Sequence, residues 1–400
     1  MRTSPTPTPA NESVEVPLAD LPRAKPGTSL YVHLPFCATK CRYCDFPSYP
    51  GRGMPIGSYL DALDAEILAR APCSPRTIFL GGGTPTYLEP REIERVFASI
   101  RETTDFDPAQ TEVTVEANPE SATEEKLDLL RRCGANRLSL GVQAMRDRIL
   151  RFFDRPHDVG GARRAVETAR KCGFDNLSLD LIFGAPGQTP GEWREDLSAA
   201  LALGPDHISL YDLTYEEGTA FRRWLDRGWL SPLPEETCRE LYRISIDLAE
   251  ASGLVHYEIS NFARPGRECR HNLVYWRNEA YAGVGCGAAS FVGGARWRND
   301  PRVLPYLRAL ERGAAPLIER ERLEGLERLR EFLFLGLRLR GGVDRSVLLR
   351  ETGLDLASTF PTEIRRLIGA GLVDFDGENL RLTSSGLLVA DSVISSFFSS

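Results

Sequence analysis

Short apolar segments alternate with segments of helical period between about residues 29 and 216. The predicted strands are SLYVHLPF (29–36), TIFLGGG (77–83), EVTVEA (112–117), RLSLGVQ (137–143), NLSLDLIFG (176–184) and HISLYDLTY (207–215). Helical spacing connects them, as in residues 58–71, where Leu60, Leu63 and Ile67 recur on one face. This alternation predicts βα units, a parallel sheet and therefore an α/β fold.

An internal repeat supports the same architecture. RRCGANRLSLG (131–141) and RKCGFDNLSLD (170–180) share a helix end, a Cys-Gly pair and the start of a strand. Gly134 and Gly173 fit the left-handed position that ends a helix. Six such units predict a barrel or partial barrel, whose chemistry lies where the parallel strands end.

The pattern changes after residue 217. Residues 235–253 predict a helix, and residues 256–291, rich in aromatics and glycines, are expected to cover the barrel mouth. Two short helices, a hairpin turning at Asp376-Gly377 and a last helix then resemble a small winged-helix unit. The expected organisation is a leader (1–27), a barrel core (28–250), a barrel-covering segment (251–318) and a C-terminal winged-helix-like domain (319–400).

Composition narrows the functional classes. The formal net charge is −7, from 49 basic and 56 acidic residues, so no nucleic-acid partner is expected. No run of eighteen apolar residues predicts a membrane span, and peripheral membrane contact stays open. Residues 1–27, rich in Pro and Thr, lack the apolar core of a signal peptide and are expected to be disordered. Nine cysteines, an odd number, favour a reducing, cytoplasmic location.

Three of those cysteines are crowded into HLPFCATKCRYCDF (33–46), as Cys37, Cys41 and Cys44. Structural zinc usually takes four ligands, commonly from two cysteine pairs, and no second pair follows. A disulfide conflicts with the compartment and the odd count. Three thiolates on one short loop suit a [4Fe–4S] cluster that leaves one iron free to bind a small molecule.

C-x3-C-x2-C after a first strand, with the aromatic Tyr43 before the last Cys, resembles the radical S-adenosylmethionine (SAM) superfamily. GGGTPT (81–86) is similar to its glycine-rich stretch, although these glycines also suit an ordinary tight turn. Within the superfamily, YVHLPFC, GGGTPT, EANP, LSLGVQ, DLIFGAPGQT and HISLYDLTYEEGT resemble the coproporphyrinogen-oxidase-like family, in order, across about residues 29–300.

The resemblance implies a partial (β/α)6 barrel with a [4Fe–4S] cluster on the three cysteines and SAM on its open iron. Tyr31 is then expected beside SAM and the cluster. Gly82, Gly83, Thr84 and Glu116 are expected at the methionine part, and Gln143, Arg155 and Asp180 at the ribose, carboxylate or adenine. The carboxylates of Glu116 and Asp180 can accept hydrogen bonds from an ammonium group or from hydroxyls. The alternative is that both are ordinary solvated carboxylates at strand ends.

Two members of that family differ at one position. Oxygen-independent coproporphyrinogen III oxidases carry a further Cys two positions after the last cluster Cys, where this chain has Phe46. That substitution is typical of the HemW family of heme chaperones, which resemble the oxidases. HNLVYW (271–276) is similar to a HemW stretch implicated in heme handling, which makes His271 a candidate heme ligand beside Tyr275 and Trp276. An ordinary turn with two core aromatics is the alternative.

The resemblance therefore implies a heme chaperone that binds heme and transfers it to acceptor proteins. Two alternatives stay open: a radical SAM coproporphyrinogen III oxidase, which Phe46 disfavours, and a nucleic-acid-modifying radical SAM enzyme. Whether the chain catalyses a reaction, and whether it forms a homodimer, also stay open.

Overall fold

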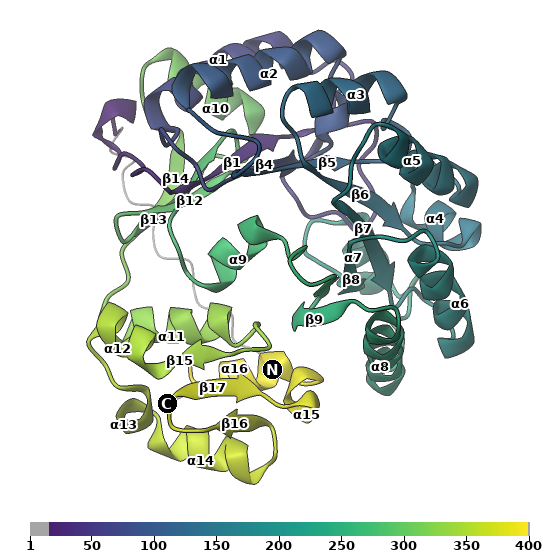
Figure 1. Ribbon diagram of the computed structural model, residues 1–400, viewed down its shortest axis with the longest axis vertical. Coiled ribbons are helices and arrows are strands. Elements are labelled where there is room, and N and C mark those ends of the chain that lie inside the picture. The colour runs from purple at the N-terminus through teal and green to yellow at the C-terminus, as the bar shows by residue number, and fades with distance from the viewer. Residues whose placement is uncertain (1–15, 399–400) are drawn as a thin grey trace.

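The computed structural model describes residues 16–398, and a twelve-stranded sheet lies at its centre (Figure 1). Six central strands run parallel in chain order: β1 (Ser29–Leu34), β4 (Thr77–Gly82), β5 (Glu112–Ala117), β6 (Arg137–Gln143), β7 (Leu177–Phe183) and β8 (His207–Asp212). Each begins at the predicted residue or one residue later. The α/β class and the partial (β/α)6 barrel are confirmed.

Helices cover the outer face of this sheet (Figure 1). They are α1 (Ile56–Arg70), α2 (Pro90–Thr103), α3 (Glu124–Arg132), α4 (Asp147–Phe153), α5 (Val159–Lys171), α6 (Pro190–Leu201) and α8 (Glu235–Ala251). The repeated Cys-Gly pairs end α3 and α5 as predicted: Gly134 and Gly173 have φ of +99° and +81°. Each left-handed residue turns the chain directly into the next strand.

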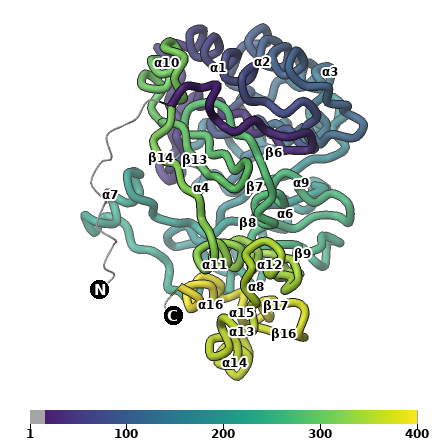
Figure 2. The backbone as a smooth tube through the Cα atoms, turned by 90° about the vertical axis from the view of Figure 1, so that its left-hand side faces the viewer, coloured from purple at the N-terminus to yellow at the C-terminus, as the bar shows by residue number. Residues whose placement is uncertain are grey.

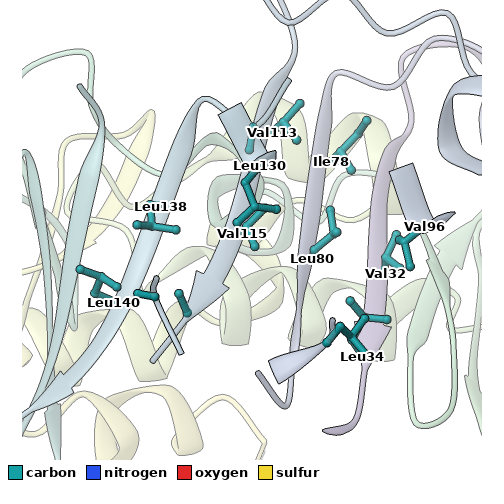
Figure 3. Close-up of a cluster of buried hydrophobic side chains, with 14 of the residues drawn as sticks. Val32, Leu34, Ile78, Leu80, Val96, Val113, Val115, Leu130, Leu138 and Leu140 are labelled. Atoms are coloured by element: carbon teal, nitrogen blue, oxygen red, sulfur yellow. The ribbon is translucent and has the colours of Figure 1, made fainter. Parts of the chain in front are cut away.

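The apolar core lies between the sheet and these helices. Val32, Leu34, Ile78 and Leu80 alternate along β1 and β4 and point to the helices (Figure 3). Because successive side chains of a strand point to opposite faces, the intervening residues, such as Glu116 of β5, face the inside of the barrel. The inner face is therefore where polar chemistry is concentrated.

Segments from late in the chain extend both edges of the sheet. β11 (Tyr281–Val284) pairs with β1 and continues into β12 (Ala289–Val292), β13 (Ala295–Asn299) and β14 (Leu317–Glu321); β10 (Asn261–Ala263) and β9 (Val255–Glu258) follow β8. The helix α10 (Val303–Glu311) lies between β13 and β14 in the chain, and α7 (Ala220–Asp226) follows β8.

One part of the segment expected over the barrel mouth occupies another place. Its helix, α9 (Arg270–Trp276), lies against the concave side of the sheet (Figure 1). The amides of Arg270 and His271 donate to the Glu112 carboxylate, and His271 Nδ1 lies 2.7 Å from the Thr77 hydroxyl. Glu112 and Thr77 begin β5 and β4, whereas the cysteine segment follows the far end of β1. The expectation of a cover over the mouth is wrong for α9.

The C-terminal domain forms a second lobe with its own apolar core (Figure 2). It contains α11 (Gly325–Gly336), β15 (Val343–Asp344), α12 (Arg345–Thr352), α13 (Leu356–Thr359), α14 (Pro361–Gly369), β16 (Val373–Phe375), β17 (Asn379–Leu382), α15 (Ser384–Leu387) and α16 (Ala390–Ser395). The hairpin β16–β17 turns at Asp376-Gly377 as predicted. Since β14 still pairs with β13, the barrel sheet continues to Glu321 rather than stopping at residue 318.

The leader prediction is only partly within the described residues, because residues 1–15 lie outside them. Residues 16–27 are ordered: η1 (Leu18–Asp20) follows a bridge between Pro17 and Ala314, and Leu21 is buried. The expectation of disorder is therefore wrong for this part. Within residues 16–398, no helix combines the length and apolar character needed to cross a bilayer.

Candidate functional site

The cysteine loop, residues 37–46, follows β1 and is closed by a short parallel ladder. β2 (Phe36–Cys37) pairs with β3 (Tyr49–Pro50), and the Gly51 amide donates to the Cys37 carbonyl at 2.8 Å. Lys40 Nζ donates to the carbonyls of Phe46 and Ser48 across the loop. These contacts fix both ends of the loop at the mouth of the barrel.

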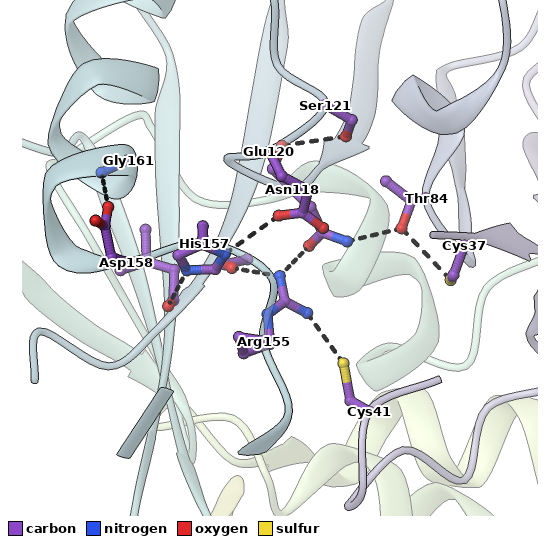
Figure 4. A network of polar contacts seen from close by, with 12 residues as sticks. Cys37, Cys41, Thr84, Asn118, Glu120, Ser121, Arg155, His157, Asp158 and Gly161 are labelled. Carbon is purple, nitrogen blue, oxygen red and sulfur yellow. Dashed lines mark hydrogen bonds and ion pairs between the residues drawn. The ribbon is translucent and has the colours of Figure 1, made fainter. Parts of the chain in front are cut away.

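A chain of hydrogen bonds links two of the three thiols (Figure 4). Thr84 Oγ1 donates to Cys37 Sγ at 3.4 Å and accepts from Asn118 Nδ2 at 2.7 Å. Arg155 donates to the Asn118 side-chain oxygen and, through Nη1, to Cys41 Sγ at 3.3 Å. Thr84, which follows β4, and Arg155, which follows α4, therefore supply donors to sulfur, as is common around thiolate-bound metal clusters.

The thiols themselves are partly shielded from water. Burial raises the pKa of Cys37 to about 11 and also raises the pKa of Cys44, which favours the protonated thiol over the thiolate at both positions. Ligation would therefore release protons. Within residues 16–398, no three His, Cys, Asp or Glu side chains converge closely enough to hold a single metal ion. In an iron–sulfur cluster, by contrast, each cysteine thiolate binds a different iron, so the thiols do not have to converge on a single ion.

The glycine-rich turn after β4 requires residues without a side chain. A Cβ on Gly83 would lie 2.7 Å from the Leu34 carbonyl oxygen, and one on Gly82 would lie 2.2 Å from the His33 ring. The Gly83 amide donates to Leu34 and the Gly82 amide to Glu116 Oε2. The bare backbone of the turn thus packs directly against the end of β1.

Two carboxylates face the inside of the barrel near this turn. Burial, reinforced by the nearby Asp180, raises the pKa of Glu116 to about 8. Burial also raises the pKa of Asp180, which accepts hydrogen bonds from Ser139 and Ser178. A cationic or hydroxyl-bearing ligand would stabilise the charged forms of both groups.

A cavity of about 860 Å³ joins these elements. Of the fourteen residues predicted to bind cofactors, twelve line it: Cys37, Cys41, Tyr43, Cys44, Phe46, Gly82, Gly83, Thr84, Glu116, Gln143, Arg155 and Asp180. The individual roles of these residues stay predictions, but all twelve lie around one cavity. Its volume is typical of pockets for cofactors and drug-sized ligands.

Three of these residues have distinctive geometry. Gln143 ends β6 with φ of +66°, beside an irregularity in the β6–β7 pairing, and strained backbone of this kind is often found at functional sites. Tyr43 packs edge-on against Phe153, with 5.2 Å between ring centroids. Phe46 is 64% exposed at the cavity wall, so a large apolar ring is available to a ligand.

The two remaining candidates, Tyr31 and His271, lie outside the cavity lining. The Tyr31 hydroxyl lies 2.9 Å from His33 Nδ1, deeper in the barrel. His271 is 1% exposed, and its Nε2 lies 2.9 Å from the Tyr275 hydroxyl while Nδ1 faces Thr77. Both imidazole nitrogens are therefore occupied in this conformation. All five histidines fall within the described residues, all are buried, and the cavity lining includes none of them.

The sequence reasoning missed two parts of the site. One part is Asn118, which connects Thr84 to Arg155 and lies within the EANP motif. The second part is a cavity wall from the C-terminal domain, residues 387–392, together with Arg338. No local motif marks that wall, because its position depends on how the two lobes pack.

Comparison with known proteins places this fold and site in a class. The radical SAM superfamily model matches residues 31–200, and the HemN C-terminal domain model matches residues 323–389. The structure is similar to coproporphyrinogen III oxidase (HemN) from Escherichia coli, a radical SAM enzyme, with a TM-score of 0.81 and 27% identity over 95% of this chain and 91% of that chain. Fold and site thus define a radical SAM protein.

Curated relatives identify the family more closely. The heme chaperone HemW of Bacillus subtilis is 37% identical over 92% of this chain and 98% of its own length. That of Lactococcus lactis is 34% identical over 92% of this chain and 97% of its own length. The chain belongs to the HemW family, which confirms the resemblance drawn from the sequence.

Proposed function

We propose that this protein binds heme and transfers it to acceptor proteins in the cytoplasm, on a scaffold that holds a [4Fe–4S] cluster and SAM. Membership of the HemW family supports the proposal. Phe46 is the observation that carries it. Where the related oxidases have a further cysteine, this chain presents an exposed aromatic ring at the cavity wall, suited to contact with a flat apolar macrocycle.

The cluster would be held by Cys37, Cys41 and Cys44. The donor set fits such a group: three thiols border one cavity, and Thr84, Arg155 and Ser48 lie within hydrogen-bond reach of their sulfurs. When bound and reduced, the cluster would supply an electron to SAM. Arg155 would place a positive charge beside Cys41 and so stabilise the thiolate.

SAM would lie between the glycine-rich turn and the two carboxylates. Glu116 accepts from the Gly82 amide and keeps a second oxygen for an ammonium group. Asp180 lies farther along the same inner face, where it can accept from ribose hydroxyls. These residues bind and orient the cofactor, and the walls of the cavity limit its contact with water.

Anaerobic reconstitution followed by parallel assays tests the proposal. Reconstituted protein should bind heme at a defined stoichiometry, measured by titration of the Soret band, and should load apo-myoglobin more completely than free heme in buffer does. It should leave coproporphyrinogen III unchanged under reducing conditions with SAM. Turnover of coproporphyrinogen III without heme uptake would overturn the proposal in favour of an oxidase.

A pair of variants tests the role of the exposed ring. Phe46→Ala is expected to weaken heme binding by about 2- to 10-fold, the range for loss of one aromatic contact. Phe334→Ala is the matched control, because Phe334 is also an exposed phenylalanine but lies on the C-terminal domain outside the cavity lining. Equal effects of the two substitutions would contradict a specific role for Phe46.

A further inference from the structure

Within residues 16–398, three basic side chains line the cavity: Arg155, Arg239 and Arg338. They differ in how many hydrogen bonds and ion pairs each guanidinium already makes. Arg155 is committed to the Cys41 sulfur, to Asn118 and to the Gly141 carbonyl. Arg239 forms ion pairs with two carboxylates of its own helix, Glu235 and Glu236. Neither guanidinium is free to receive an anionic ligand without losing existing partners.

Arg338 is held differently. It follows α11, where the C-terminal lobe meets the barrel, and its guanidinium carbon lies 4.4 Å from the centre of the Trp276 ring. The nearest carboxylate oxygen, on Glu258, lies 3.6 Å away, beyond hydrogen-bond distance. Arg338 Nε is buried and has no hydrogen-bond partner in the described part of the chain.

The pairing with Glu258 is weaker than its distance alone indicates. Burial raises the pKa of Glu258, so its negative charge is disfavoured. The same carboxyl already accepts through its other oxygen from the Ser260 amide. The guanidinium of Arg338, one quarter exposed and only loosely paired with Glu258, is therefore presented at the cavity wall.

The surroundings of Arg338 indicate the class of ligand. Leu388 and Val389, both half-buried, line the same cavity from the C-terminal lobe, and Phe46 lines it from the cysteine loop. Apolar walls with one available guanidinium suit a flat apolar ligand that carries a carboxylate, since Arg binds carboxylates through two parallel hydrogen bonds.

We propose that Arg338 receives a propionate of heme in this cavity and that Trp276 positions its guanidinium. The inference rests on the proposed function and names the site at which heme is recognised. The inference also connects the HNLVYW segment to the cavity. Trp276, the last residue of this segment, stacks on Arg338, whereas His271 is buried in the barrel interior. Trp276 acts only through Arg338.

Two forms of the ligand test this assignment. Wild-type protein and variants are titrated with iron protoporphyrin IX and with its dimethyl ester, which keeps the macrocycle but loses both carboxylates. Arg338→Ala is expected to weaken binding of the diacid about 10- to 100-fold and binding of the ester less than about 3-fold. Arg338→Lys should retain part of the difference, because it keeps the charge but not the planar fork.

Trp276→Ala should selectively weaken binding of the diacid and should add nothing to Arg338→Ala in the double variant. Arg243→Ala is the control, since Arg243 lies on the cavity-bordering α8 but outside the lining and pairs with Glu236. Equal losses for diacid and ester in Arg338→Ala would overturn the assignment while leaving heme binding intact. Failure of the wild-type protein to bind either form would instead overturn the proposed function.

Discussion

Substitution of Gly82 by alanine tests how the glycine-rich turn supports the cysteine loop. Gly82 has φ of +100°, and a Cβ there would lie 2.2 Å from His33 Cε1. The His33 ring cannot easily move away, because its two nitrogens lie 2.9 Å from the Tyr31 hydroxyl and from the Pro47 carbonyl. Pro47 follows the cysteine loop, so displacement of His33 would also release that end of the loop.

The expected loss of stability has two parts. A non-glycine residue in this backbone region costs about 1–3 kcal/mol. Displacing His33 adds the loss of two hydrogen bonds, each about 0.5–1.5 kcal/mol. Gly82→Ala is therefore expected to lower the free energy of unfolding by about 2–6 kcal/mol.

Gly187→Ala provides the control, because Gly187 also has positive φ, +72°, but a Cβ there would meet nothing within 4 Å. It is expected to cost only the backbone part, about 1–3 kcal/mol. Urea unfolding followed by circular dichroism measures both variants, and equal m-values would show that the denatured state is unchanged. If both variants lose the same free energy, the proposed clash with His33 is wrong.

Three further predictions concern the site. Glu116 has a folded pKa of about 8, above its unfolded value, so it stays protonated in the folded protein at pH values where the unfolded chain has lost the proton. The stability of the fold should therefore fall as pH rises from about 4.5 to 8. Glu116→Gln should flatten this dependence in thermal unfolding measured across pH. Cys41→Ser should lower the iron and sulfide bound after reconstitution, measured per chain, whereas Cys73→Ser, at an exposed cysteine outside the cavity lining, should not. His271→Ala leaves Thr77 and Tyr275 without their ring partner and should lower the free energy of unfolding in urea by about 2–4 kcal/mol. The heme spectrum of this variant, compared with wild type at equal folded fraction, tests heme ligation separately.

The sequence by itself determined the parts of this protein that depend on neighbours along the chain. Strand starts, the left-handed glycines Gly134 and Gly173 and the turn at Asp376-Gly377 all follow from local backbone preferences and side-chain periodicity. The spacing of Cys37, Cys41 and Cys44 is likewise local. Parallel strands end at one edge of a sheet, so the grouping of Glu116, Gln143 and Asp180 followed from the strand order.

Only the tertiary structure decided what closes the cavity and where the late segments lie. The α9 helix packs at the beginning of β4 and β5 because the Glu112 carboxylate accepts hydrogen bonds from its first amides. Glu112 and these amides are far apart in the sequence, so no local pattern predicts the contact. The wall at residues 387–392 and the stacking of Trp276 on Arg338 join segments with no shared period or motif. Local patterns fix which face of an element is apolar, but the partner that buries this face is selected by packing over the whole chain.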